Sequence, residues 1–312
     1  MTFLNFAAFV TALVPVSLSS ALVPVSLSSA TARTHGGASV SAALDADGVV
    51  RVNSAITSGT ASELLEWVND SLDDALRETR EHADYGAEWQ TRFGNVLSRA
   101  NRHDVKLGLE APPVRAALAA LLSTLTPSIA DILGEDAQLY ELAALISLPG
   151  AVRQPVHSDT PIVAAKGTGQ GATTLTAFCA LQDIDATMGP TVFLPATHTA
   201  EAHKAFFTYE NFEAAYSTRD EDEDEEVDDG LDARVAALLE SWSPWRGELR
   251  TGDVSLFDSR CLHAGEANTS QRKRVLFYFS FIKAEHAEAS HGTLLDNLRC
   301  KHTLGDLRVW LS

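Results

Sequence analysis

The chain has 312 residues, of which 45% are hydrophobic and 21% are charged, a composition that excludes a disordered chain and a membrane bundle. The formal net charge of −18 argues against a general electrostatic surface for nucleic acid or anionic lipid, and the chain stays acidic when the run 220–229 is left out. The three cysteines form no C-x-x-C pair, which excludes a disulfide framework. A small-molecule substrate is therefore the expected partner.

The N-terminal segment, residues 1–32, contains no charged side chain, and one nine-residue unit occurs twice in it, at 12–20 and at 21–29. Ala30-Thr31-Ala32 is similar to the small-x-small site of a cleaved peptide. The segment lacks a basic start, and prolines interrupt its apolar stretch. Two interpretations stay open, a signal or organelle-targeting peptide and a disordered tail, so localisation to the secretory pathway, an organelle or the cytoplasm stays open too.

The Gly-, Ala- and Ser-rich stretch 33–46 predicts a linker, and residues 47–312 are expected to form one domain. This domain should begin with a short strand at 47–52. Leucines and valines at helical spacing predict a helix from about Ser62, and a second helix follows Pro112-Pro113. No segment after the N-terminal one is expected to match the ~20 apolar residues of a membrane span.

From Leu139 onward the pattern changes to short apolar runs with turn residues between them, which predicts strands. The runs are 139–147, 160–166, 173–182, 190–194, 253–258 and 274–282. A polar segment at about 199–248 reads as an insertion that holds the acidic run, interpreted as a solvated loop, and a short helix at 232–242. The fold class predicted is mainly β with flanking helices, arranged as a sandwich or barrel.

The first candidate site residues are His157 and Asp159. If residues 156–160 are extended, both side chains project from the same face, because side chains alternate along a strand. His263, at the end of the 253–258 run, supplies a third ligand. Two histidines and one carboxylate make the facial triad of non-haem Fe(II) oxygenases, which leaves coordination positions open.

A triad alone does not specify a cosubstrate, but Arg274 lies eleven residues beyond His263, at the start of an aromatic strand. 2-Oxoglutarate chelates iron through its 2-oxo and C1-carboxylate oxygens, and its distal carboxylate needs a fixed cation. The planar guanidinium of Arg274 is suited to that role. Gln154 and Lys106 are further candidates for contact with cosubstrate or substrate, with an ordinary polar role as the alternative for each.

The motifs occur in an order that resembles the phytanoyl-CoA dioxygenase family. The matching residues are His157-x-Asp159, then Ala180-Leu181-Gln182-Asp183-Ile184-Asp185, Gly189-Pro190-Thr191 and Leu194-Pro195-Ala196-Thr197-His198, and last His263-x-Gly265-x-x-Asn268-x-Ser270-x-x-x-Arg274. The resemblance covers roughly residues 47–285. Ala196 departs from it, because glycine is common at this position, and His198 is a structural residue in the family.

The resemblance implies a double-stranded β-helix core, of the jelly-roll or cupin-like type, with helices packed outside it. It also implies Fe(II) and 2-oxoglutarate as cofactor and cosubstrate, O2 as oxidant, and decarboxylation of 2-oxoglutarate to succinate and CO2 as a small molecule is hydroxylated. Asp159 favours hydroxylation, since halogenating relatives lack this carboxylate. Acyl-CoA, with Arg272 and Lys273 near its phosphates, and another small metabolite both stay open as substrates.

Two other classes of function stay open at this stage. A cupin-like barrel could bind metal or ligand without turnover, and an interaction protein could act through the acidic run. Arg274 argues against the first class, because a pure binding module needs no anchor for a cosubstrate. Oligomeric state is left open by the sequence.

Overall fold

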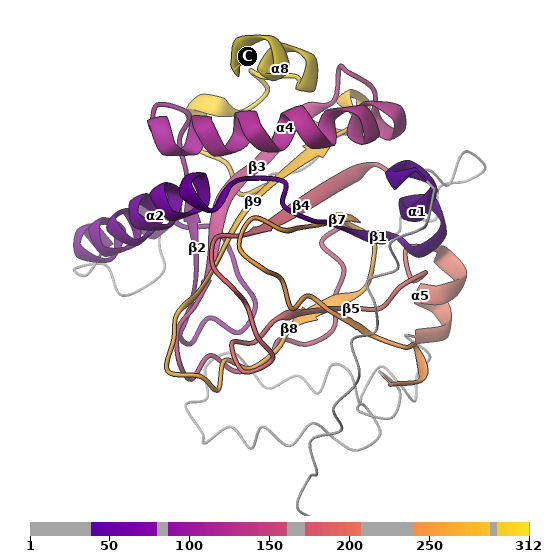
Figure 1. Cartoon of the computed structure of the whole chain (residues 1–312), viewed down its shortest axis with the longest axis horizontal. Coiled ribbons are helices and arrows are strands. Elements are labelled where there is room, and N and C mark those ends of the chain that lie inside the picture. Colours follow the sequence, from indigo (N-terminus) through magenta and orange to yellow (C-terminus); the bar gives the residue numbers. More distant parts are fainter. Residues whose placement is uncertain (1–38, 80–86, 161–171, 207–239, 288–291, 312) are drawn as a thin grey trace, which may run out of the picture. The chain divides into compact units, whose positions relative to one another are not determined.

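The computed structural model describes residues 39–79, 87–160, 172–206, 240–287 and 292–311 (Figure 1). These residues belong to one compact unit, Thr31–Ser312. Four predictions lie wholly or mostly outside the described residues: the targeting or disordered segment 1–32, the strand 160–166, the acidic run 220–229 and the helix 232–242.

Two antiparallel sheets form the core of this unit. The larger sheet has the strand order β1 (Val49–Val52), β7 (Val254–Asp258), β4 (Thr174–Ala180), β9 (Arg274–Ile282), β3 (Gln138–Ser147) and β2 (Arg102–Lys106). The smaller sheet has the order β6 (Trp245–Arg246), β5 (Thr191–Phe193) and β8 (His263–Gly265). This arrangement is the double-stranded β-helix, and the predicted fold class is confirmed.

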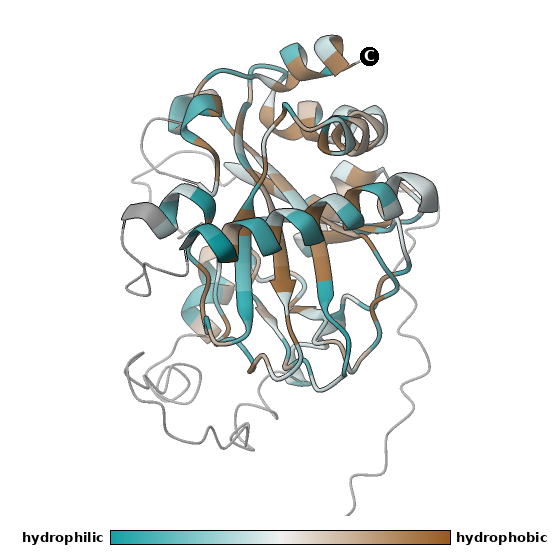
Figure 2. Ribbon diagram, turned by 90° about the vertical axis from the view of Figure 1, so that its left-hand side faces the viewer, coloured by the Kyte–Doolittle hydropathy of each residue, from teal (hydrophilic) through white to brown (hydrophobic). Residues whose placement is uncertain are grey.

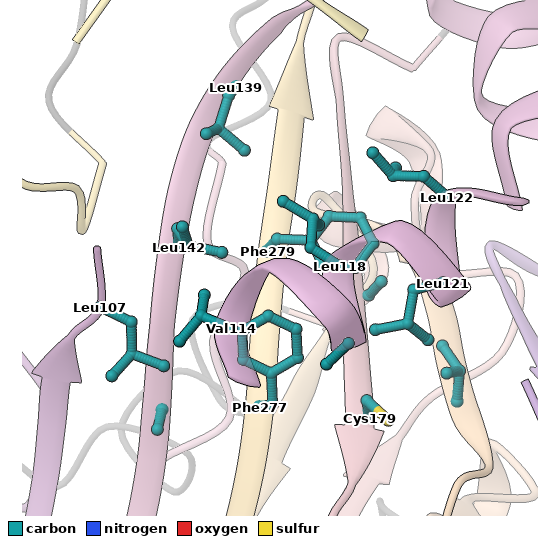
Figure 3. Close-up of a cluster of buried hydrophobic side chains, with 14 of the residues drawn as sticks. Leu107, Val114, Leu118, Leu121, Leu122, Leu139, Leu142, Cys179, Phe277 and Phe279 are labelled. Carbon is teal, nitrogen blue, oxygen red and sulfur yellow. The ribbon is translucent and has the colours of Figure 1, made fainter. Parts of the chain in front are cut away.

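The α-helices lie outside the two sheets. In chain order they are α1 (Val40–Asp47), α2 (Ser58–Thr79), α3 (Ala87–Arg92), α4 (Pro112–Leu133), α5 (Ala200–Phe206) and α8 (Leu304–Leu311), with 3-10 turns at Ala284–His286 and Asp296–Leu298. In Figure 1, α4 crosses one side of the larger sheet and α8 lies above α4. Figure 3 shows Leu118 and Leu121 of α4 in one layer of buried side chains with Leu142, Cys179 and Phe279 of the strands. The two helices predicted from leucine spacing are confirmed.

The two faces of the larger sheet differ because side chains alternate along each strand. The odd-numbered residues of β9, such as Phe277 and Phe279, pack in the apolar layer under α4. The even-numbered residues, such as Leu276 and Tyr278, face the inside of the barrel. Figure 2, seen from the side of α2, shows the hydrophilic surface of that helix in front of hydrophobic strand segments. Of the candidate site residues, Arg274 of β9 and Lys106 of β2 lie on this inner face.

The helix α1 corrects the predicted linker 33–46. The side chain of Ser39 caps its start by accepting a hydrogen bond from the Ala42 amide at 3.2 Å, and Gly48 ends it with a left-handed φ of 71°. Ala43 and Leu44 are buried. The alanines that suggested a linker are good helix formers, and the burial of one short face gives the helix its place.

Two further expectations are corrected. The helix α4 is long and apolar enough by composition to cross a membrane, contrary to the expectation that no such segment follows the N-terminus. Its buried residues pack in the layer over the sheet, as in the core helix of a globular domain. The expected insertion 199–248 also contains β6, which pairs with β5, so this stretch includes part of the smaller sheet.

Candidate metal centre and adjoining cavity

The backbone brings two of the predicted ligands together. The amide of His157 donates to the carbonyl of His263 at 2.9 Å, and the amide of His263 donates to the carbonyl of His157 at 2.8 Å. This antiparallel bridge places the two imidazole centroids 4.4 Å apart. The loop before β4 is therefore fixed to the start of β8 at the position where the side chains are needed.

Asp159 completes the group. One of its carboxylate oxygens lies 3.7 Å from His157 Nε2 and the other lies 3.6 Å from His263 Nε2. Ligand atoms of all three residues lie within 4.8 Å of one another. The structure thus brings together the three residues that the sequence put forward, and two imidazoles with one carboxylate are a donor set that suits Fe(II).

The hydrogen bonds of both rings leave the same nitrogen free for a metal. His157 Nδ1 lies 2.9 Å from the carbonyl of Pro155, and His263 Nδ1 lies 3.0 Å from the carbonyl of Cys261. A carbonyl accepts only, so each Nδ1 carries the proton and each Nε2 presents its lone pair. Burial lowers the pKa of each ring to about 4, so both imidazoles are neutral at neutral pH.

Aromatic side chains surround His263. The centroids of Phe257, Phe193 and Phe178 lie 5.2, 5.7 and 6.4 Å from that of its ring. Burial raises the pKa of the nearby Cys261 thiol to about 12, so this thiol stays protonated and offers no thiolate to a metal. The three phenylalanines form an apolar collar that holds His263 in one orientation and keeps water from its inner side.

Arg274 is fully buried at the start of β9. Its Nη1 donates to the carbonyl of Gly189, while its Nε and Nη2 have no hydrogen-bond partner. Burial lowers its pKa to about 9, and the positive charge of Arg102 adds to this shift. Buried donors without partners are costly, and a ligand carboxylate would satisfy them. This is the observation expected of an anchor for 2-oxoglutarate.

Arg102 is a second buried arginine that the sequence did not single out. In the strand registers, Ser147 of β3 pairs with Arg102 of β2 on one side and with Arg274 on the other. The Arg102 guanidinium donates to Ser147 Oγ at 3.3 Å and to the carbonyls of Ser98 and Glu266 at 3.2 and 3.4 Å. Each of its three nitrogens has a partner, so Arg102 fastens loops beside Arg274.

The two remaining candidates have different settings. The Gln154 side chain accepts from the Gly265 amide at 3.0 Å and donates to the carbonyl of Leu97 at 3.1 Å, so it braces β8 just beyond His263. The ammonium of Lys106 donates to the carbonyl of Gln90 at 2.5 Å and lines the cavity beside the triad.

This cavity has a volume of about 370 Å³ and shares Asp159 with the triad. Its lining residues are mostly polar and come from segments far apart in the chain: Gln90, Phe93, Gly94, Asn95, Lys106, Tyr140, Glu141, Asp159, Thr160, Thr174, Ser259, Gly292, Thr293 and Arg299. The exposed side of Asp159 therefore faces a polar, partly open space. A substrate placed here would lie next to the metal ligands.

A pair of acidic side chains on the inner face adjoins the cavity. Asp104 accepts from the Tyr278 hydroxyl at 2.9 Å and from the Thr293 hydroxyl at 2.9 Å, and Glu141 accepts from the Ser280 hydroxyl at 2.8 Å. Burial raises the pKa of Asp104 to about 7 and that of Glu141 to about 8. Both acids were missed in the sequence analysis. Glu141 had one local signal, since it is the only charged residue in the apolar run 139–147, whereas β2 around Asp104 is polar.

The two cations considered for acyl-CoA phosphates lie elsewhere. Arg272 forms an ion pair with Asp185, and the Lys273 ammonium donates to Asn69 Oδ1 at 2.8 Å. Neither residue lines the cavity. The structure gives no support to their proposed role with a CoA group.

Comparison with known proteins agrees with this geometry. The model of the phytanoyl-CoA dioxygenase (PhyH) family matches residues 44–276. Among solved structures, HygX from Streptomyces hygroscopicus, solved with nickel and 2-oxoglutarate, has 17% identity over 77% of this chain and 85% of its own, with a TM-score of 0.50. The epimerase SnoN has 19% identity over 78% of this chain and 79% of its own, with a TM-score of 0.49. No curated protein matches the chain. The likeness to HygX shows the fold.

Proposed function

The chain belongs to the phytanoyl-CoA dioxygenase family of Fe(II)- and 2-oxoglutarate-dependent oxygenases, and we propose that it hydroxylates a small molecule bound beside His157, Asp159 and His263. The observation that carries this proposal is the Arg274 guanidinium, which is buried with two unpaired nitrogens. The triad alone would suit several divalent metals. A buried cation with open donors adds the place for a dicarboxylate cosubstrate.

Each residue of the centre has a distinct task. The two histidines present neutral Nε2 atoms, held by the Nδ1 contacts with Pro155 and Cys261. Asp159 supplies a negative charge that offsets the charge of a divalent metal, and Arg274 would pair with the distal carboxylate of 2-oxoglutarate. When bound, Fe(II) and 2-oxoglutarate supply the activation of O2 that oxidation of a C–H bond requires.

The presence of Asp159 supports hydroxylation within this family. Its carboxylate occupies the position that halogenating relatives leave open for halide. The collar of Phe178, Phe193 and Phe257 shields one side of His263 from water, while the polar cavity lies on the side of Asp159. Substrate would therefore approach the centre from the side of Asp159, where the cavity lies.

Anaerobic titration of the full chain with Fe(II) and then 2-oxoglutarate tests the proposal. We expect the visible metal-to-ligand charge-transfer band of the chelate in the wild type. His157→Ala should abolish the band through loss of metal, whereas His286→Ala, a change at an exposed histidine in a 3-10 turn, should leave it unchanged. Bound metal with no band on addition of 2-oxoglutarate would contradict the proposal and favour a non-catalytic barrel.

A further inference from the structure

The wall of the cavity limits the chemistry of a substrate. Apart from Phe93, the ring of Tyr140 and two glycines, its lining side chains are polar or charged. A space of about 370 Å³ is at the small end of ligand sites, and a long apolar chain would leave these polar groups without partners. The cavity therefore suits a small polar molecule.

The charges of the wall are unevenly paired. The ammonium of Lys106 has the carbonyl of Gln90, and the Arg299 guanidinium has the Asp296 carboxylate at 2.9 Å. Glu141 accepts hydrogen bonds only from neutral groups, the Ser280 hydroxyl at 2.8 Å and the Thr293 amide at 3.4 Å. Within the described part of the chain, no ion pair involves Glu141 or the neighbouring Asp104. Glu141 thus lacks a cation partner, whereas the charge of Lys106 acts on Asp104.

A second, independent feature points into the same space. Thr174 lines the cavity, has only 2% of its surface exposed, and its hydroxyl has no hydrogen-bond partner. It lies at the start of β4 on the inner face, in line with Thr176 and Phe178. A buried hydroxyl with no partner is uncommon, and a ligand group that hydrogen-bonds to it would remove the cost.

We infer that the substrate of the proposed oxygenase is a small amino alcohol or amino sugar, whose ammonium group is held by the Glu141 carboxylate and whose hydroxyl group bonds to Thr174. The inference rests on the proposed function, because it assigns the cavity beside the triad to the substrate. A cation next to Glu141 would offset the buried negative charge. Burial is the main cause of the raised pKa of Glu141, about 8, and the negative charge of Asp159 adds to it.

A matched pair of small probes tests the inference. 2-Amino-1,3-propanediol and glycerol differ only in an ammonium or a hydroxyl on the central carbon. In protein loaded with Mn(II) and 2-oxoglutarate, the paramagnetic ion speeds the relaxation of probe protons that bind nearby, and the dependence on probe concentration gives the Kd. We expect the amine to bind at least about tenfold more tightly than glycerol, a difference of about 1.4 kcal/mol.

Two variants test whether Glu141 causes the preference for the amine over glycerol. Glu141→Gln should reduce it to about twofold or less, and Glu135→Gln, at an exposed position paired with Arg308, should leave it unchanged. Equal binding of the two probes by the wild type would overturn the inference, as would an amine preference that survives in Glu141→Gln. The wild-type comparison needs no variant, so it decides the matter even if Glu141→Gln lowers stability.

Failure of the inference and failure of the proposed function are distinguishable. If the charge-transfer band forms with Fe(II) and 2-oxoglutarate but the probes bind alike, the oxygenase site stands and the substrate class is wrong. If no band forms, the proposed function itself fails, whatever the probes do.

Discussion

The inner face of β2, β3 and β9 carries opposite charges in two regions. One region has Arg102 and Arg274 on either side of Ser147, and the other has Asp104 and Glu141 bound to hydroxyls of β9. Arg102, Arg274 and Asp104 are buried and Glu141 is half-buried, and the arginines do not pair with the acids. Such a separation is costly unless ligands of opposite charge complete it.

The two regions are suited to partners of opposite charge. The cationic region suits the distal carboxylate of 2-oxoglutarate, and the acidic region suits a cationic substrate. Within the cationic region the two arginines also differ: all three nitrogens of Arg102 have partners, whereas two nitrogens of Arg274 have none. Arg102 therefore holds the fold, and Arg274 is left for a ligand.

The largest expected effect is on cosubstrate binding. Arg274→Met keeps an unbranched side chain and removes its charge and its donors, so the Kd for 2-oxoglutarate should rise by about 100-fold or more, roughly 2.7 kcal/mol. Titration of the charge-transfer band measures this Kd. Arg272→Met, at an exposed arginine paired with Asp185, is the control and should change it by less than about twofold. A similar Kd in wild type and Arg274→Met would show that Arg274 does not bind the distal carboxylate of 2-oxoglutarate.

The next prediction is that the two arginines contribute differently to the free energy of unfolding. Arg102→Met leaves Ser147 Oγ and two carbonyls without a donor and should lower the free energy of unfolding of the metal-free protein by about 2–3 kcal/mol. Arg274→Met removes a charge that has few partners and should change it by less than about 1 kcal/mol. Urea unfolding measures both values, and equal losses would show that the contrast between the arginines is wrong.

The last prediction concerns the pH dependence of stability, which Glu141 of the acidic region should influence. Burial raises the pKa of Glu141 in the folded protein from 4.5 to about 8, so the folded state binds more protons than the unfolded state between these values. Wild-type stability should therefore fall relative to Glu141→Gln as the pH rises through this window. Urea midpoints at about pH 5 and pH 8 check the sign. Glu135→Gln should show the same pH dependence as the wild type. A Glu141→Gln variant that loses as much stability as the wild type between pH 5 and pH 8 would contradict the raised pKa of Glu141.

Local sequence patterns predicted much of the fold. The apolar run 274–282 coincides with β9, and the His-x-Asp spacing with the distant His263 marked the residues that the structure brings together. Ala196 has a left-handed φ of 61°, which explains why glycine is common at this place in the family. These features depend on residues close together in the chain or on a family motif.

The remaining features depend on strand register, which the sequence does not display. Arg102 and Arg274 are neighbours only because Ser147 pairs with both. Glu141 stands in an otherwise apolar run, and only its pairing with Ser280 shows that it faces inward. The short helix α1 was missed because its composition matches that of a linker and its stability comes from tertiary burial.

Turnover of 2-oxoglutarate tests the enzymatic assignment most directly. Full-length protein supplied with Fe(II), 2-oxoglutarate and O2 should form succinate even without its primary substrate, slowly, and His157→Ala should form none above the rate of free Fe(II). His286→Ala should match the wild type. A protein that forms the charge-transfer band but no succinate, with or without the amine probe, would be a barrel that binds metal and 2-oxoglutarate without catalysing oxidation.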